Sequence, residues 1–581
     1  MKLGTKNDRR VWWLGMLCVA GVLAGYCIIV GFCGMPPTEG WYTWYAELIN
    51  NGEVVYRDFS YLFYPFYIQF IALFCKVFGY NILALRILGL FVFTGIGVAA
   101  YLLFSRLTNV PGAAVGAVAT TMFLQSEVVQ IFYDYIRFMD IFAYLSVYFL
   151  VCYMQRIKEL KDTKKLSASA IFCALFGTLA CMVKQSTGTL LIVYTVVLFA
   201  FAALVLYKTY AKRILQDLLT YLAVVAVLFA VMFVGLLASG ALEAFFVNAT
   251  GSALDAKGGL ANVLFRWIQQ NLLAMRNQLV PGAGILSFAV LLRIVSHIHV
   301  KETGSGTEIV LSAQGVGKWG KAKASAKENM ILLLAGTLMV GGLLLLTRKF
   351  ESFREWYRGN FDYTMPVFGF VLCTMAFAAI GFWLLFRVLK KRKAQEKQAL
   401  DDCILPVFPW FALLGAIFAI GYGSGISGGL CESQTALSVG FLIVLLSKAL
   451  ENSKFRILGM VLLILYGTTF SVACASRKYV EMYSWWGLSE GPVWEADYTA
   501  KSPMLAGIKM TKNEQLMYDG VLEIVEENTD EDDTIFCFPH IPIFYSLTGR
   551  TSSTYTQVQW FDVSNVRDIN RDIQTLKDNP P

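Results

Sequence analysis

The chain contains 581 residues, of which 57% are hydrophobic, 14% aromatic and only 15% charged. A soluble domain carries about 25% charged residues, so this composition excludes an ordinary soluble protein and predicts an apolar surface that faces lipid. The net charge of +8 does not indicate a nucleic-acid partner, because the basic residues lie in alternate loops between apolar segments, as they do in membrane proteins.

Apolar segments long enough to cross the ~30 Å hydrocarbon core of a bilayer recur along the chain. They predict an all-α polytopic membrane protein with about thirteen spanning helices, and no cleavable signal is evident before the first of them. The expected spans are residues 11–33, 82–104, 110–127, 136–155, 167–182, 187–207, 217–240, 280–298, 329–347, 363–387, 404–422, 432–449 and 456–473.

The distribution of basic residues predicts the topology. The N-terminal segment and the loops at 156–165, 208–213, 318–327 and 387–397 are basic and all fall on one side. Short loops rich in Lys and Arg face the cytoplasm, so we expect a multi-pass cell-membrane protein with a cytoplasmic N-terminus and an extracytoplasmic C-terminus. The glycine-, serine- and lysine-rich loop 301–327 is predicted to be a flexible cytoplasmic linker.

The first outer loop, residues 34–81, is predicted to contain two interfacial helices. Residues 61–78 are apolar and nearly long enough to span, but a span there would reverse the charge bias of every later loop, and the run contains Pro65 and Gln69. Earlier in the loop, aromatic and aliphatic residues at helical spacing predict a helix lying flat in the headgroup layer; they are Trp41, Trp44, Tyr45, Leu48 and Ile49.

Three parts follow from these patterns: a transmembrane domain over 1–473, an extracytoplasmic connector over 474–511, and the start of a small soluble extracytoplasmic α/β domain over 512–581. In the last part we expect a helix over 518–528, a short strand over 534–538 and a turn over 546–550.

Ionisable residues near or within a bilayer are costly and therefore indicate function. Glu39 could hydrogen-bond an acceptor or orient a metal ion, or it could simply favour a helix N-terminus. Asp58 could be a second acid and Arg57 a phosphate clamp, or the two could pair and hold the loop together. Arg137 and Asp140 lie three residues apart, so they predict either a helical ion pair or charges that line an outer cleft.

Further candidates lie in the later outer loops. Lys184 could bind a lipid phosphate, or it could snorkel from a helix end. The outer loop with Arg348 and Arg354 breaks the charge bias, which suggests an anionic headgroup unless nearby glutamates neutralise it. Glu432 and Gln434 end a small-residue segment that could line a sugar pocket or allow close helix packing.

One short motif, Ser484-Trp485-Trp486-Gly487, resembles the WWD signature of oligosaccharyltransferases but lacks its acid, so a pair of interfacial tryptophans explains it better.

A series of short motifs runs through the first two hundred residues. They are Thr38-Glu39-Gly40-Trp41-Tyr42, the pattern Gly-Glu-x-x-Tyr-Arg-Asp-Phe over 52–59, Tyr64-Pro65, Phe78-Gly79, Arg86, Arg137-Phe138-Met139-Asp140, and Lys184-Gln185 followed by Gly188. In these motifs the chain resembles the GT-C glycosyltransferases of the protein mannosyltransferase and lipid A aminoarabinose-transferase type. The resemblance covers residues 10–210 well, whereas the later helices and the C-terminal part agree only in architecture.

The resemblance implies a glycosyltransferase that takes a polyprenyl-phosphate-linked sugar on the outer face and inverts its anomeric centre. The acceptor would be a cell-envelope glycan, a glycolipid or a protein. It also implies that Tyr42 and Gln185 lie in the substrate pocket. The family usually has Asp-Glu in the first loop, with the Asp as base, but Thr38 occupies that position here. The base is therefore Glu39, Asp58 or Asp140, unless activity has been lost.

A polyprenyl phosphate is a good leaving group, so the reaction needs a base for the acceptor hydroxyl and cations for the phosphate. A divalent metal is compatible with this chemistry, but no ligand cluster in the sequence demands one. Two other functions stay open: a transporter or flippase for a lipid-linked glycan, and an inactive GT-C scaffold that binds donor lipid. Against a transporter are the lack of internal repeats and of helices broken at mid-membrane.

Overall fold

The computed structural model describes residues 6–125, 131–157, 163–205, 210–251, 298–303, 306–311, 352, 433–450, 456–485, 488–559 and 566–581. Apart from residue 298, the predicted spans 280–298, 329–347, 363–387 and 404–422 lie outside these ranges.

Helices of 14 to 28 residues occupy the other nine predicted spans. They are α1 (Lys6–Val30), α4 (Ile82–Phe104), α5 (Val110–Phe123), α6 (Tyr135–Arg156), α7 (Thr163–Val183), α8 (Gln185–Val205), α9 (Ala211–Ala238), α18 (Ser433–Leu450) and α19 (Arg456–Val480). Six of them, α1, α4, α6, α8, α9 and α19, are long and apolar enough to cross a membrane.

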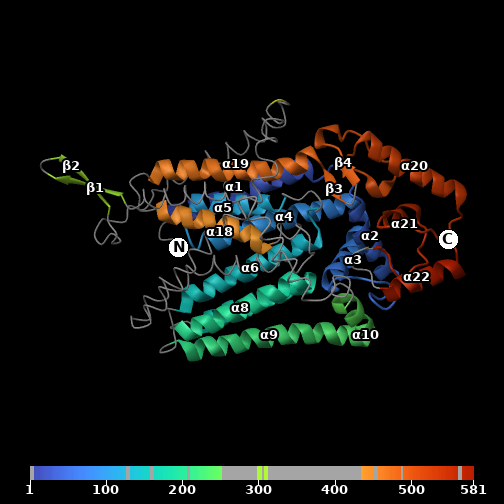
Figure 1. The fold of residues 1–581 in the computed structure, drawn as a ribbon, viewed down its shortest axis with the longest axis horizontal. Coiled ribbons are helices and arrows are strands. Elements are labelled where there is room, and N and C mark those ends of the chain that lie inside the picture. The colour runs from blue at the N-terminus through green and yellow to red at the C-terminus, as the bar shows by residue number, and fades with distance from the viewer. Residues whose placement is uncertain are drawn as a thin grey trace.

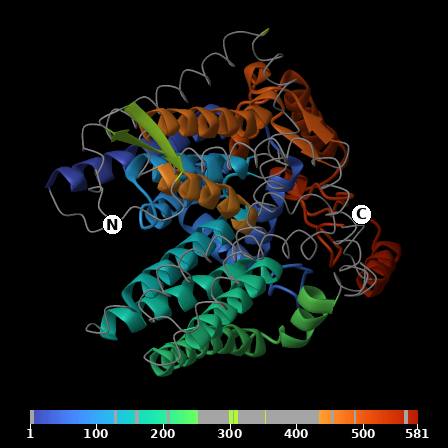
Figure 2. The ribbon, with the colours of Figure 1, turned by 60° about the vertical axis from the view of Figure 1, so that its left-hand side comes forward.

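The helices pack as two groups joined by α4 and α6. In one group α1, α4, α5, α18 and α19 contact one another, and in the other α6, α7, α8 and α9 do so. Both ribbon views show the groups side by side (Figures 1 and 2). Small residues allow the closest approach in the first group, because a Cβ at Gly112 would lie 2.1 Å from Ser447 Oγ and one at Gly440 would lie 2.2 Å from Phe104.

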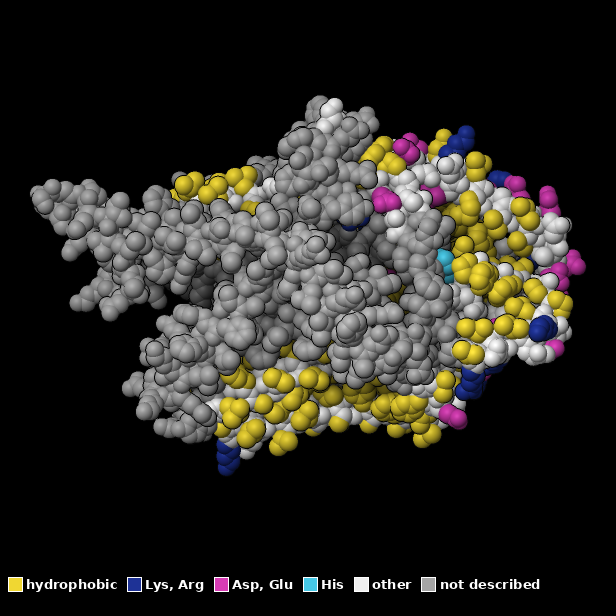
Figure 3. Space-filling model, viewed as in Figure 1, with side chains coloured by type: hydrophobic (Ala, Val, Ile, Leu, Met, Phe, Trp, Pro, Cys, Tyr) yellow, Lys and Arg dark blue, Asp and Glu magenta, His cyan; other side chains and the backbone are white. Residues whose placement is uncertain are grey.

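The outer face of α9 is apolar and uncovered. Leu219, Val227, Val231 and Val234 are each more than 60% exposed, and Figure 3 shows a band of hydrophobic side chains along the edge where α9 lies. In water, an exposed apolar band of this size would need a partner protein to cover it, whereas in a membrane the lipid chains cover it.

The first loop contains the short helix η1 (Pro37–Glu39), α2 (Gly40–Asn50) and α3 (Phe66–Phe78). The side chains of Trp41, Tyr42, Trp44 and Tyr45 are buried in protein, so the expectation that this aromatic face lies in the headgroup layer is wrong. The reason is tertiary: α2 packs between α3 and the C-terminal helix α21 (Ile543–Thr548). Helix α3 has 13 residues, too few to span a bilayer.

Two elements follow α9 directly: the single-turn helix α10 (Leu242–Phe245) and a π-helix, η3 (Phe246–Gly251). Farther along, β1 (Ile298–Thr303) pairs with β2 (Gly306–Leu311) in an antiparallel hairpin. The predicted linker over 301–327 is therefore structured where it overlaps this hairpin.

Beyond α19 the chain forms a hairpin of β3 (Tyr483–Trp485) and β4 (Leu488–Glu490), two short helices η6 (Val493–Glu495) and η7 (Pro503–Leu505), then α20 (Lys512–Asn528), α21 and α22 (Val566–Asp578). The predicted helix 518–528 begins earlier, at Lys512, because Thr511 and Glu514 form a capping box. The predicted strand 534–538 forms one isolated bridge, between Thr534 and Thr551, and the predicted turn is where α21 ends at the left-handed Gly549.

The first loop and the C-terminal region lie at the same end of the helix bundle (Figure 1). They are joined by backbone hydrogen bonds between residues 32–34 and Lys509, and by α2 packing on α21. Elements from the two ends of the sequence therefore build one surface above the helices.

Candidate active site

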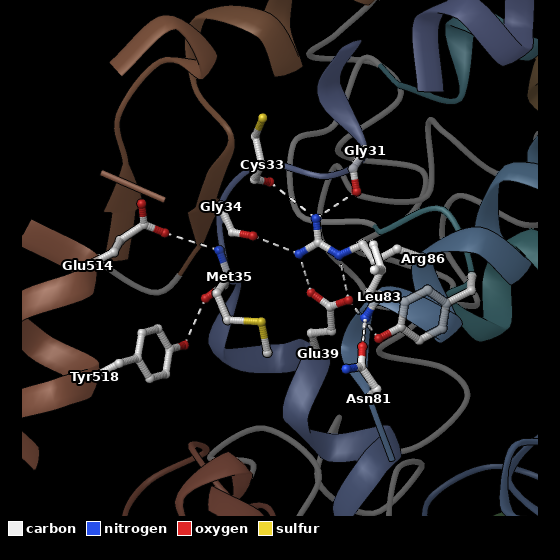
Figure 4. Close-up of polar contacts among 11 residues, drawn as sticks. Gly31, Cys33, Gly34, Met35, Glu39, Asn81, Leu83, Arg86, Glu514 and Tyr518 are labelled. Carbon is white, nitrogen blue, oxygen red and sulfur yellow. Dashed lines mark hydrogen bonds and ion pairs between the residues drawn. The ribbon is translucent and has the colours of Figure 1, made fainter. Parts of the chain in front are cut away.

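Glu39 lies at the centre of a buried ion pair. Arg86 Nε donates to Glu39 Oε1 at 2.7 Å and Arg86 Nη2 lies 2.5 Å from Glu39 Oε2. The same guanidinium donates to the carbonyls of Gly31, Cys33 and Gly34, where the chain leaves α1 (Figure 4). A second residue, Tyr133, donates its hydroxyl to Glu39 Oε1 at 2.7 Å.

These contacts indicate that Glu39 holds neighbouring segments of the chain together. Both carboxylate oxygens accept bonds, and its side chain is 0% exposed while that of Arg86 is 4% exposed. Using Glu39 as a base would break a buried pair, which costs about 3–5 kcal/mol when one partner is lost. The geometry favours Glu39 as a positioning residue that joins α1, α2, α4 and the loop before α6, and its catalytic assignment stays a prediction.

Arg137 and Asp140 form a second buried ion pair, on the first turns of α6. Arg137 Nη1 lies 2.6 Å from Asp140 Oδ2, and both side chains are 0% exposed. Arg137 Nη2 also donates to the carbonyl of Leu124, at the end of α5. The pair therefore ties two helices together below the first loop.

Asp58 and Arg57 form the third pair, at the surface. The guanidinium donates to both Asp58 oxygens, and the side chains are 49% and 32% exposed for Arg57 and Asp58. The hydrogen bond from Arg57 lowers the pKa of Asp58 below its usual value. Arg57 also donates to the carbonyl of Ser239 after α9. All three predicted acids are therefore paired with arginines, and Asp58 is the most accessible.

A fourth acid, Asp134, was not predicted from the sequence. It caps α6 by accepting from the Ile136 amide, and its other oxygen accepts from the Tyr42 hydroxyl at 2.7 Å. Burial raises the pKa of the Asp134 carboxyl above its usual value, although hydrogen bonds from Ile136 and Tyr42 and the charges of Arg137 and Lys184 act in the opposite direction. An Asp directly before a helical segment is a capping signal, and it could have identified Asp134.

Lys184 and Gln185 lie where α7 ends and α8 begins, and Lys184 is buried within electrostatic range of Asp134. The Gln185 amide donates to the carbonyls of Leu62, in the first loop, and Ala249, in η3. The structure thus brings Tyr42, Asp134, Arg137, Asp140 and Lys184 together at one end of the bundle; we call these five residues the buried charged cluster.

Other predicted residues are not placed. Arg348, Arg354 and Glu432 lie outside the described residues, and Gln434 belongs to the first turn of α18 without a described side chain. Trp485 is the last residue of β3, and Trp486 lies outside the described ranges.

Within the described ranges, no group of three or more His, Cys, Asp or Glu side chains is arranged to hold a metal ion. The acids of the candidate site pair with Arg, Lys or Tyr groups instead.

No protein-family model matches the chain, and no curated protein matches its sequence. The Archaeoglobus fulgidus oligosaccharyltransferase, solved in complex with Zn and sulfate, aligns with a TM-score of 0.51 at 12% identity, over 94% of this chain and 62% of that one. The archaeal oligosaccharyltransferase from the same organism, solved with an inhibitory peptide and a dolichol-phosphate, aligns with a TM-score of 0.49 at 13% identity, over 96% of this chain and 65% of that one.

The chain thus spans less than two thirds of the length of these solved structures. At this identity the likeness concerns the fold. The protein has the fold of an archaeal oligosaccharyltransferase, which is a polytopic membrane glycosyltransferase of the GT-C type.

Proposed function

We propose that the protein is an inverting membrane glycosyltransferase that moves a sugar from a polyprenyl-phosphate donor to a hydroxyl or amide acceptor at the extracytoplasmic surface. The acceptor would be an envelope glycan, a glycolipid or a protein. The observation that carries the proposal is the buried charged cluster. Its Tyr42 belongs to helix α2 of the first loop, on which α21 of the C-terminal region packs, in a chain with the fold of a GT-C glycosyltransferase.

The cluster contains an acid that could accept the acceptor's proton and cations that could bind the leaving phosphate. A single displacement forms the bond from the acceptor oxygen or nitrogen to C1 of the sugar and breaks the bond from C1 to the phosphate oxygen, which leaves with the electron pair. We assign the acceptor proton to Asp134, because burial raises the pKa of its carboxyl and a carboxylate of higher pKa is a stronger base. Lys184, Arg137 and the exposed Arg57 would hold the leaving phosphate.

Release of free polyprenyl phosphate tests the proposal. Purified protein in lipid nanodiscs is mixed with a panel of polyprenyl-phosphate sugars, with and without a membrane extract as acceptor. We expect acceptor-dependent release by the wild type, about 10²–10⁴-fold less by Asp134→Asn, and a raised donor KM in Lys184→Ala. Asp530→Asn, an exposed acid of the C-terminal region, is the matched control and should keep full activity.

The variants also decide among the acids. If Asp58→Asn or Asp140→Asn abolishes release while Asp134→Asn does not, the base is one of the acids predicted from the sequence. Release by none of the proteins, or lipid flipping without release, would contradict the transferase.

A second candidate is a donor-binding scaffold without transfer activity. The pairing of Glu39, Asp58 and Asp140 with arginines favours it, as does Thr38 in place of the family's acid. Tight binding of a polyprenyl-phosphate sugar with no release in the presence of any acceptor fraction would support this candidate.

A further inference from the structure

Tyr555 connects three separate parts of the molecule. Its hydroxyl donates to the carbonyl of Tyr56, in the first loop, and accepts from the side-chain amide of Asn248, in η3. Its own carbonyl accepts from the Ser60 amide at 2.9 Å. Tyr555, Tyr56 and Asn248 are all buried, so these bonds are shielded from water and from competition by it.

The residue held by this hydroxyl has an unusual backbone. Tyr56 has φ 69°, and among the described residues it is the one non-glycine with a positive φ. A bulky residue adopts this conformation only when its surroundings impose it, and such strain is often found at functional sites. The next two residues are Arg57 and Asp58, so the conformation of Tyr56 sets where that exposed ion pair lies.

Gln185, at the start of α8, connects the same two segments. Its amide donates to Leu62 in the first loop and to Ala249 in η3, while Tyr555 contacts residues 56 and 60 of that loop and Asn248 of η3. The loop segment 56–62 and the π-helix are thus tied together twice, once by Tyr555 and once by Gln185. π-Helical turns often mark functional positions.

Tyr555 itself is held firmly. Asp572 of α22 accepts from the backbone amides of Tyr555 and Thr556, and the Arg571 guanidinium lies 4.0 Å from the centre of the Tyr555 ring. Burial raises the pKa of Tyr555 to about 12, so the hydroxyl keeps its proton, and its donor bond to Tyr56, across the physiological range.

We propose that Tyr555 is a positioning residue, which clamps the first-loop segment 56–62 against η3 and thereby fixes Arg57 where it meets the donor phosphate. The candidate site is then complete only when the C-terminal region is docked. The role of Arg57 rests on the proposed function, whereas the clamp itself does not.

Hydrogen exchange tests the clamp without any assay of activity. The full chain in nanodiscs is compared with Tyr555→Phe, which keeps the ring over which Arg571 lies, and with Tyr498→Phe, an exposed tyrosine of the same region. We expect faster exchange in peptides covering both 56–62 and 246–251 in Tyr555→Phe, and wild-type exchange in Tyr498→Phe. Unchanged exchange in either peptide of Tyr555→Phe would overturn the clamp.

Kinetics test whether Tyr555 acts through Arg57. Losing the hydroxyl should raise the donor KM about tenfold, with kcat and the acceptor KM unchanged, and Arg57→Gln should show the same pattern. The double variant should then be no worse than Arg57→Gln alone, because the two changes remove one interaction. Additive effects would overturn the positioning role. If the wild type releases no polyprenyl phosphate, the proposed function fails and the exchange result still decides the clamp.

Discussion

Two nitrogens of Arg86 bind the two carboxylate oxygens of Glu39, at 2.7 and 2.5 Å. The same guanidinium also donates to three backbone carbonyls at the end of α1. One buried arginine of α4 therefore fixes both the exit of the first helix and the start of the first loop. This arrangement makes Glu39 part of the packing between the first helix, α4 and the first loop.

Removing one partner of this pair should destabilise the protein strongly. We expect Glu39→Gln and Arg86→Met each to lower the free energy of unfolding by about 3–5 kcal/mol, because each leaves a buried charge unpaired. The double variant should recover part of that loss. Thermal unfolding in detergent measures both effects, and Glu523→Gln, whose exposed pair with Lys501 lies in the C-terminal region, is the control.

If Glu39→Gln unfolds at the wild-type temperature but transfers no sugar, Glu39 has a catalytic role and this prediction is wrong.

The pH dependence of turnover should report Asp134. Burial raises the pKa of this carboxyl, and a base works in its deprotonated form, so the acid limb of kcat should lie above the usual aspartate pKa of about 4. The hydrogen bond from Tyr42 acts to lower the pKa. Tyr42→Phe should therefore move the acid limb to higher pH, which a pH–rate profile from pH 4 to 8 measures.

An unchanged acid limb in Tyr42→Phe, with normal activity, would show that Asp134 is not the titrating base.

Stability should depend on pH through Glu490. This residue of β4 is buried and shares a hydrogen bond with Glu514, and burial first, then Glu514, raises its pKa well above the usual value. The folded state therefore keeps a proton that the unfolded chain releases above a pH of about 4.3. The stabilisation is fully present below that pH and is lost as the pH rises through the folded pKa.

Glu490→Gln removes this titration, so its unfolding midpoint should fall less than that of the wild type between pH 5 and pH 8. Differential scanning calorimetry in nanodiscs measures the two slopes, with Glu523→Gln again as the control. Parallel slopes in Glu490→Gln and wild type would contradict the assignment.

The exposed pair of Arg57 and Asp58 should matter for turnover and little for folding. Solvent screens such pairs, so we expect Arg57→Gln and Asp58→Asn to keep the wild-type unfolding midpoint. If Arg57 meets the donor phosphate, Arg57→Gln should raise the donor KM about tenfold. A shift of the unfolding midpoint with an unchanged KM would instead assign the pair to the structure of the loop.

Much of the helical framework is predictable from local sequence. The predicted span 82–104 matches α4 at both ends, and the spans at 136–155 and 456–473 match α6 and α19 closely at their first residues. Apolar runs of this length have one favourable environment, so their position follows from composition alone. Helix ends that depend on capping are harder to predict from the sequence. Helix α20, for example, starts at Lys512 because Thr511 and Glu514 form a capping box.

The candidate site was only partly predictable. For Arg137 and Asp140 the sequence left open a helical ion pair or charges that line an outer cleft, and the structure shows the ion pair. Asp134 was missed, since its partners Tyr42 and Lys184 are distant in sequence. The aromatic face of α2 was assigned to lipid because its periodicity does not distinguish burial in a headgroup layer from burial in protein.

By itself, the sequence determined that this chain spans a membrane many times and that its first loop carries charged and aromatic residues, because hydrophobic length and charge bias are properties of short segments. The tertiary structure decided which acid pairs with which cation, and that the C-terminal region packs on the first loop. Contacts such as Glu39 with Arg86, or Tyr56 with Tyr555, join residues far apart in the chain, and only the packing of the helices brings them within hydrogen-bonding distance.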